Sequence, residues 1–115
     1  MLISNFFEAK GQPQVSHDGE GLINHVYCFR SDDFDTTLKF ILAIDIPSGG
    51  SVGYHEHGDN EEVYVILEGH GLMTVNDEKR EVKPGDVILN KPGWSHGIQN
   101  ITDTNLKILV FEVNM

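Results

Sequence analysis

The sequence lacks several features that would place it in other protein classes. Its one cysteine, Cys28, can form no internal disulfide, so we expect a buried thiol in the reducing cytoplasm. Basic residues are few: 8 lysines and arginines stand against 18 aspartates and glutamates, for a formal net charge of −10. Such a surface repels phosphate backbones and anionic lipid headgroups, so neither nucleic acid nor membrane is an expected partner. No apolar run approaches the roughly 18 residues of a membrane span, and we expect no signal peptide at the start.

Helical periodicity is missing nearly everywhere, and short β-branched or aromatic runs closed by turn residues take its place. The chain of 115 residues is of the size of a single domain, with an N-terminal arm or strand region over 1–30 and a barrel over 36–115. Residues 4–10 are compatible with a short helix, and residues 8–21 otherwise read as loop. About nine strands are expected, which predicts an all-β fold built as a double sheet or small barrel. The expected strands lie in 22–29, 36–46, 51–57, 61–69, 71–75, 80–82, 87–90, 95–100 and 106–113.

Polar residues with metal-binding chemistry gather just before the fourth of these runs. Because side chains alternate along a strand, His55 and His57 project from one face while Glu56 points the other way. Glu62 shares its face with Tyr64, and an inward carboxylate is expensive unless it is paired or binds a metal. His96 follows a Pro-Gly turn. Three imidazoles and a carboxylate suit a divalent transition metal, although an isolated His-x-His is more typical of an exposed hairpin edge.

The spacing of these residues forms two patterns. Gly49 is followed by five residues, His55, one residue, His57, four residues, Glu62, six residues and Gly69. In the second pattern, Gly85 is followed by seven residues, Gly93, two residues, His96, three residues and Asn100. Together they resemble the two sequence motifs of the cupin superfamily and span residues 49–69 and 85–100. One position departs from the family pattern, because the usual proline site holds Lys91 and Pro92 follows it.

The resemblance implies a double-stranded β-helix, or jelly-roll, cupin barrel with one metal ion at its mouth. Matched residue by residue, the ligands would be His55, His57, Glu62 and His96, and the ion Mn, Fe, Ni, Cu or Zn. Glu61 competes with Glu62, since the motif tolerates a shorter gap, but only Glu62 leaves six residues before Gly69. The motif glycines 49, 69, 85 and 93 would lie at bends with positive φ or close backbone approach, and Asn100 would be a turn residue.

Other residues near the motifs are expected to shape the site. Tyr64 and Ile66 share the inward parity of Glu62, and Phe40, Leu42 and Ile44 are candidates to line the barrel. Tyr64 is the candidate catalytic, proton-transferring residue, because no second inward carboxylate or free histidine is evident. Trp94 and Gln99 are candidates for the mouth. Tyr54 should face away from the metal, and the remaining histidines, His17, His25 and His70, are expected at the surface or in loops.

The resemblance allows two functions and leaves both open. The first is a metal-dependent enzyme, of dioxygenase, decarboxylase or isomerase type, acting on a small carboxylate or diol chelated by the metal. The second is a non-enzymatic cupin that binds or senses a metal or small acid, because this fold hosts many functions. Small cupins of one barrel commonly form homodimers by adding an N-terminal strand to the partner's sheet, and residues 22–29 would supply it.

Overall fold

The structure, a computed structural model that describes residues 1–115, consists of ten strands and one 3-10 helix of three residues. The all-β class predicted from the sequence is confirmed, and strands β2 to β10 follow the nine expected runs. The elements are β1 (Gln12–Gln14), β2 (Ile23–Arg30), η1 (Ser31–Asp33), β3 (Leu38–Ile46), β4 (Ser51–Glu56), β5 (Asn60–Glu68), β6 (Gly71–Val75), β7 (Glu78–Val82), β8 (Val87–Asn90), β9 (Ser95–Gln99) and β10 (Leu106–Asn114). No helix in this structure has the length and apolar character needed to cross a membrane.

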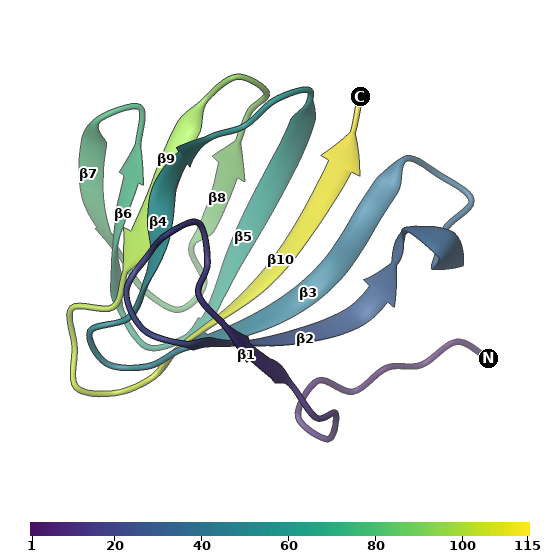
Figure 1. Cartoon of the computed structure of the whole chain (residues 1–115), viewed down its shortest axis with the longest axis horizontal. Helices are drawn as coiled ribbons and strands as arrows, with labels where there is room; N and C mark the ends of the chain where they lie inside the picture. The colour runs from purple at the N-terminus through teal and green to yellow at the C-terminus, as the bar shows by residue number, and fades with distance from the viewer.

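Two antiparallel sheets face each other and form the fold (Figure 1). One has six strands in the order β1-β2-β3-β10-β5-β8, and the other has four in the order β4-β9-β6-β7. Strands far apart in the sequence are neighbours in both sheets, as where β10 lies between β3 and β5. This arrangement is consistent with the jelly-roll barrel that the sequence predicts.

Alternation along the strands divides the six-stranded sheet into an inner and an outer face. Tyr27, Leu42, Val110 and Tyr64 are register partners across four adjacent strands and form one row on the inner face. Leu42, Val110 and Tyr64 are buried, and Tyr27 packs against the core from its rim. Leu106, at the other end of β10, is fully buried. The apolar core therefore fills one end of the space between the two sheets. The polar residues of the candidate site, described below, lie toward the other end.

The glycines of both motifs lie at turns. The φ angles of Gly49, Gly69, Gly85 and Gly93 are all positive, at 75°, 81°, 95° and 76°, as the motif predicts. At the departure from the family pattern, the Trp94 N–H donates to the Lys91 carbonyl at 3.1 Å, so residues 91–94 form a type II turn with glycine in its third position. A proline at 92 is therefore accommodated by a tight turn that leads directly into β9.

Asn100 closes the loop before β10 from a buried position. Its amide nitrogen donates to the carbonyls of Ile46, at 3.0 Å, and Thr104, at 2.7 Å. Its backbone carbonyl accepts from the Gly49 N–H at 3.1 Å. These contacts confirm that Asn100 is a turn residue.

The N-terminal segment differs from its expectation in two respects. Residues 6–8 form only a turn, with the Ala9 N–H donating to the Asn5 carbonyl at 3.0 Å, so the short helix over 4–10 is wrong. Part of the expected loop forms β1, which pairs with β2. Strand β1 covers β2 only at Ile23–His25, so the outer edge of β2 beyond His25 has no partner strand within the chain. The role given to residues 22–29 in dimer formation stays a prediction.

The loop between β1 and β2 docks on β4 of the opposite sheet (Figure 1). The Gly53 N–H donates to the Ser16 carbonyl at 3.0 Å, and the Ser51 N–H donates to the Glu20 carbonyl at 2.9 Å. The two backbones approach so closely at Gly53 that a Cβ there would overlap the carbonyl oxygen of His17. The N-terminal loop thus forms one border of the space between the sheets.

Candidate metal centre

The four predicted ligands, far apart in sequence, come together between the two sheets. His55 lies on β4 directly opposite His96 on β9, His57 follows the end of β4, and Glu62 begins the inner face of β5. One donor atom from each residue lies within 4.8 Å of the other three. The Glu62 Oε1 atom is 3.3 Å from His57 Nε2 and 3.1 Å from His96 Nε2. Glu61, the competing carboxylate, is not part of this cluster.

Hydrogen bonds orient two of the imidazoles with one nitrogen toward the cluster. The His55 Nδ1 donates to the Gly53 carbonyl at 2.7 Å, and the His57 Nδ1 donates to the Asn60 amide oxygen at 2.5 Å. When the rings are neutral, these bonds place the hydrogen on Nδ1 and leave the lone pair on Nε2. The buried Nε2 atoms of His55, His57 and His96 have no hydrogen-bond partner.

Unpaired buried nitrogens destabilise a fold unless something satisfies them. Three imidazole nitrogens and a carboxylate oxygen aimed at one point are a donor set suited to a divalent transition metal. The residues present therefore fit such an ion.

The electrostatics of the cluster favour an ionised glutamate among the histidines. Burial raises the pKa of Glu62, but the close contacts with the imidazoles of His57 and His96 outweigh it and lower the pKa to about 2. The contact with the Glu62 carboxylate in turn raises the pKa of His57. Burial lowers the pKa of His55 to about 4, so this imidazole is neutral at pH 7 and its lone pair is available.

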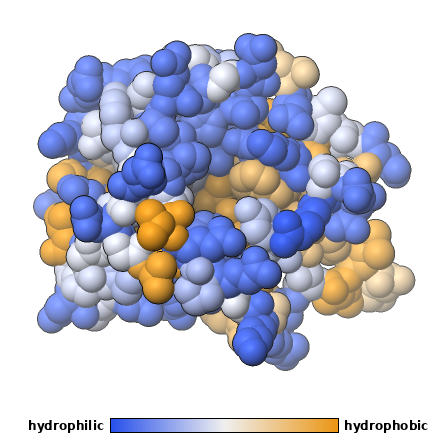
Figure 2. Space-filling view, viewed as in Figure 1, coloured by the Kyte–Doolittle hydropathy of each residue, from blue (hydrophilic) through white to orange (hydrophobic).

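A cavity of about 290 Å³ opens beside the four residues, lined by residues of both sheets and of the N-terminal loop. On the face shown in Figure 2 the molecule is hollowed near its centre, with apolar residues in the depth and mostly hydrophilic residues around it. Phe40, Leu42 and Ile44 line the cavity as predicted, and Tyr64 lies against it with its side chain buried. Trp94 and Gln99 do not line it.

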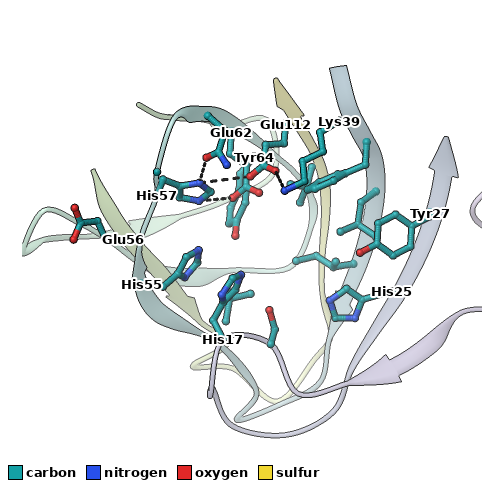
Figure 3. A pocket seen from close by; sticks show the side chains of 18 residues that line it. His17, His25, Tyr27, Lys39, His55, Glu56, His57, Glu62, Tyr64 and Glu112 are labelled. Atoms are coloured by element: carbon teal, nitrogen blue, oxygen red, sulfur yellow. Dashed lines mark hydrogen bonds and ion pairs between the residues drawn. The ribbon is translucent and has the colours of Figure 1, made fainter. Parts of the chain in front are cut away.

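A second carboxylate, which the sequence reasoning missed, lies in the same cavity. Glu112 is 4% exposed and is the register partner of Glu62 on the adjacent strand. One of its oxygens is 3.5 Å from His57 Nδ1, and the other is 3.1 Å from the Lys39 ammonium (Figure 3). Burial and the charge of Glu62 raise the pKa of Glu112, while Lys39 opposes that shift.

Two further histidines line the cavity: His17 lies in the loop between β1 and β2, as expected, whereas His25 lies on strand β2, so its expected surface or loop position is wrong. The His17 ring stacks on the His55 ring, with centroids 3.5 Å apart and an interplanar angle of 6°. His25 is buried on β2, at the opposite wall of the cavity (Figure 3). His70 is exposed, as expected, and Tyr54 faces away from the cluster with its hydroxyl near Asp77.

Sequence and structure comparisons agree with this architecture. A model of the cupin domain matches residues 43–112, so the chain belongs to the cupin family. An oxalate-binding protein of Thermotoga maritima is 31% identical over 91 residues, which are 79% of this chain and 75% of that protein. An uncharacterized protein of Methanocaldococcus jannaschii is 50% identical over 64 residues, which are 56% of this chain. The match spans only 51% of that relative's length.

A solved structure extends the likeness over the whole fold. The crystal structure of a predicted oxalate decarboxylase from Thermotoga maritima superimposes with a TM-score of 0.95 at 25% identity, covering 99% of this chain and 100% of that one. The cupin fold predicted from two motifs therefore extends over nearly all of residues 1–115.

Proposed function

We propose that this protein is a metal-dependent enzyme that acts on a small organic acid or diol held by a divalent ion at His55, His57, Glu62 and His96. The observation that carries the proposal is the set of three buried, unpaired Nε2 atoms around an ionised carboxylate at the wall of a cavity. An ion bound there would supply Lewis-acid chemistry toward a chelated carboxylate, enol or diol. The names of the Thermotoga maritima relatives, which refer to oxalate, support a substrate with a carboxylate.

Two side chains beside the proposed ligands are suited to handle protons. Burial and the neighbouring carboxylates keep the pKa of Tyr64 well above 10, so its phenol is neutral and can donate a hydrogen bond to a substrate oxygen. Glu112 reaches the cavity with the oxygen that is not paired with Lys39, and that oxygen can accept or return a proton. We assign Tyr64 to orienting the substrate and Glu112 to proton transfer.

A binding protein without catalysis is the second candidate. The observation that favours it is that one relative of known name is called an oxalate-binding protein rather than an enzyme. The two candidates share the metal centre and differ only in turnover.

Turnover assays on metal-loaded protein separate them. The protein is incubated with dicarboxylates and catechols, before and after removal of the metal by a chelator. An enzyme converts at least one compound, loses that activity with the metal, and is slowed by Tyr64→Phe and by Glu112→Gln. Tyr54→Phe, at an exposed tyrosine pointing away from the site, serves as the control and should retain the activity. Tight binding without conversion of any compound favours the binding protein.

We also propose that two copies pair through the outer face of the six-stranded sheet. Side chains on this face are apolar and only half-buried along β5 and β10, and the neighbouring Val87 and Leu89 are 65% and 45% exposed. Copies that each carry a net charge of −10 repel one another least where a face carries few charges. The half-buried residues are Val63, Val65, Leu67, Leu109, Phe111 and Val113.

Light scattering measures this assembly directly. A dimeric mass is expected for the wild type and a monomeric mass for Val65→Glu, whereas Tyr54→Glu on the other sheet should remain a dimer. A monomeric wild-type protein contradicts the proposal.

A further inference from the structure

The cavity has a second polar end, which lies across the sheet from the proposed metal ligands. His25 and Tyr27 lie on β2, whereas Glu62 and Tyr64 lie on β5, and strands β3 and β10 separate them. Tyr27 and Tyr64 occupy the two ends of one register row. Three strand spacings of about 4.8 Å place their backbones about 14 Å apart. Figure 3 shows His25 and Tyr27 on the wall that faces His55 and His57.

His25 presents an acceptor to this end of the cavity. It is 9% exposed, and its Nδ1 donates to the Ile23 carbonyl at 2.9 Å. A carbonyl can only accept, so the ring hydrogen is on Nδ1 and the neutral ring carries its lone pair on Nε2. The His25 ring lies at the wall of the cavity (Figure 3), and no protein group donates to its Nε2.

Tyr27 presents a hydroxyl beside that acceptor. Its ring is fixed from two sides: the Phe40 ring meets it edge-on at 5.9 Å between centroids, and the Arg30 guanidinium lies 4.0 Å from its centroid. The hydroxyl points into the cavity, and it forms no hydrogen bond with the protein (Figure 3). A phenol can both donate and accept.

This pair complements a hydroxyl group better than a carboxylate. A hydroxyl can donate to His25 Nε2 and accept from the Tyr27 hydroxyl, whereas a carboxylate can only accept. No unpaired ammonium or guanidinium lines the cavity, because its lysine, Lys39, already pairs with Glu112. A second anionic group would instead add negative charge to a cavity that already holds the carboxylates of Glu62 and Glu112.

The space between the two ends suits a short carbon chain. Leu42, Ile44 and Val110 form an apolar floor there, and they lie on the two strands that separate β2 from β5. The cavity volume of about 290 Å³ equals roughly ten water molecules in the liquid, more than a two-carbon diacid fills.

From these contacts we infer that His25 and Tyr27 form a hydroxyl-binding subsite, and that the ligand is a hydroxylated organic acid with its carboxylate end at the metal and a distal hydroxyl at β2. This inference rests on the proposed function, because the metal centre holds the other end. It refines the substrate class from small acids in general to hydroxy acids of several carbons.

Pairs of ligands that differ by one hydroxyl test the inference. Calorimetric titrations of the full chain loaded with Mn²⁺ compare 2-hydroxy acids of four, five and six carbons with the same acids carrying a second hydroxyl on the last carbon. We expect the dihydroxy acid to bind about 3- to 10-fold more tightly at one chain length, the effect of one or two net hydrogen bonds. Tyr27→Phe and His25→Asn should each reduce this preference and leave the 2-hydroxy acids unaffected.

The variants are chosen to preserve the fold. Phenylalanine keeps the ring packing of Tyr27, and asparagine can keep the donor to the Ile23 carbonyl. Tyr54→Phe is the control and should retain the full preference. A wild type without any preference, or a preference that survives in both variants, overturns the inference.

Metal content measured on the same samples separates this inference from the proposed function. Full Mn²⁺ uptake without a hydroxyl preference contradicts the subsite alone, whereas a chain that takes up no Mn²⁺ contradicts the metal centre and the subsite together.

Discussion

Replacement of Gly53 by alanine tests how firmly the N-terminal loop is fixed to the site. A methyl group at this position would overlap the His17 carbonyl oxygen, so the loop must move away from β4. Three hydrogen bonds hold the loop there: Gly53 N to the Ser16 carbonyl at 3.0 Å, Ser51 N to the Glu20 carbonyl at 2.9 Å, and Glu20 N to Ser51 Oγ at 2.9 Å.

The magnitude follows from the size of the clash and of the bonds. Each bond contributes about 1 kcal/mol, and forcing an extra methyl group into a packed contact costs about 1–3 kcal/mol. We therefore expect Gly53→Ala to lower the free energy of unfolding by about 1–3 kcal/mol. With an unfolding entropy of about 2.1 cal/mol/K per residue, a chain of 115 residues loses about 4 °C in Tm per kcal/mol, so Tm should fall by about 4–12 °C.

Thermal unfolding followed by circular dichroism measures this change against a matched control. Gly58 lies five residues further on, has no atom within 4 Å of the added Cβ, and does not have a positive φ. Gly58→Ala should leave Tm unchanged or raise it slightly, because alanine restricts the unfolded chain. If the two variants unfold at the same temperature, the loop is not held against β4 as described.

Three more predictions concern the metal centre. Glu62 raises the pKa of His57 above its usual 6.5, so a metal that binds His57 must displace a proton. The affinity for the metal should therefore fall about tenfold per pH unit below that raised pKa. A metal affinity that does not change between pH 6 and pH 8 would contradict this prediction. Asn60→Ala removes the acceptor that fixes the His57 ring and should weaken metal binding about 10-fold or more, while Asn60→Asp retains it; equal affinity of all three proteins would show that the contact does not orient the ring. Metal at 100 times its Kd should stabilise the wild type by about 2.7 kcal/mol in thermal unfolding, and a similar gain in His96→Ala would place the metal elsewhere.

The strands and the four proposed ligands could be predicted because both depend on local patterns. Alternation of apolar residues predicts strands β2 to β10. The spacing of histidine, glutamate and glycine resembles the cupin motifs, and this resemblance assigns His55 and His96 to one site. Parity also contained the signal for Glu112, which was overlooked: it lies two residues after Val110, so both face inward on β10. His25 likewise shares the inward parity of Ile23.

Other parts of the site have no such pattern in the sequence. His17 and Asp18 have positive φ angles of 49° and 58° in a loop without periodicity, so nothing local predicts that His17 stacks on His55. Strand β1 has three residues, contains a proline and is exposed throughout. Its strand conformation depends on pairing with β2, a tertiary contact, and propensity alone favours a loop.

Metal analysis of the purified protein tests the central claim most directly. The wild type, loaded with a divalent transition metal and then dialysed, should retain about one ion per chain, as expected for one set of four converging donors. The double variant His55→Ala, His96→Ala loses two of those donors and should retain none, with its fold checked by circular dichroism. Equal metal content in the two proteins would contradict the assignment of this site.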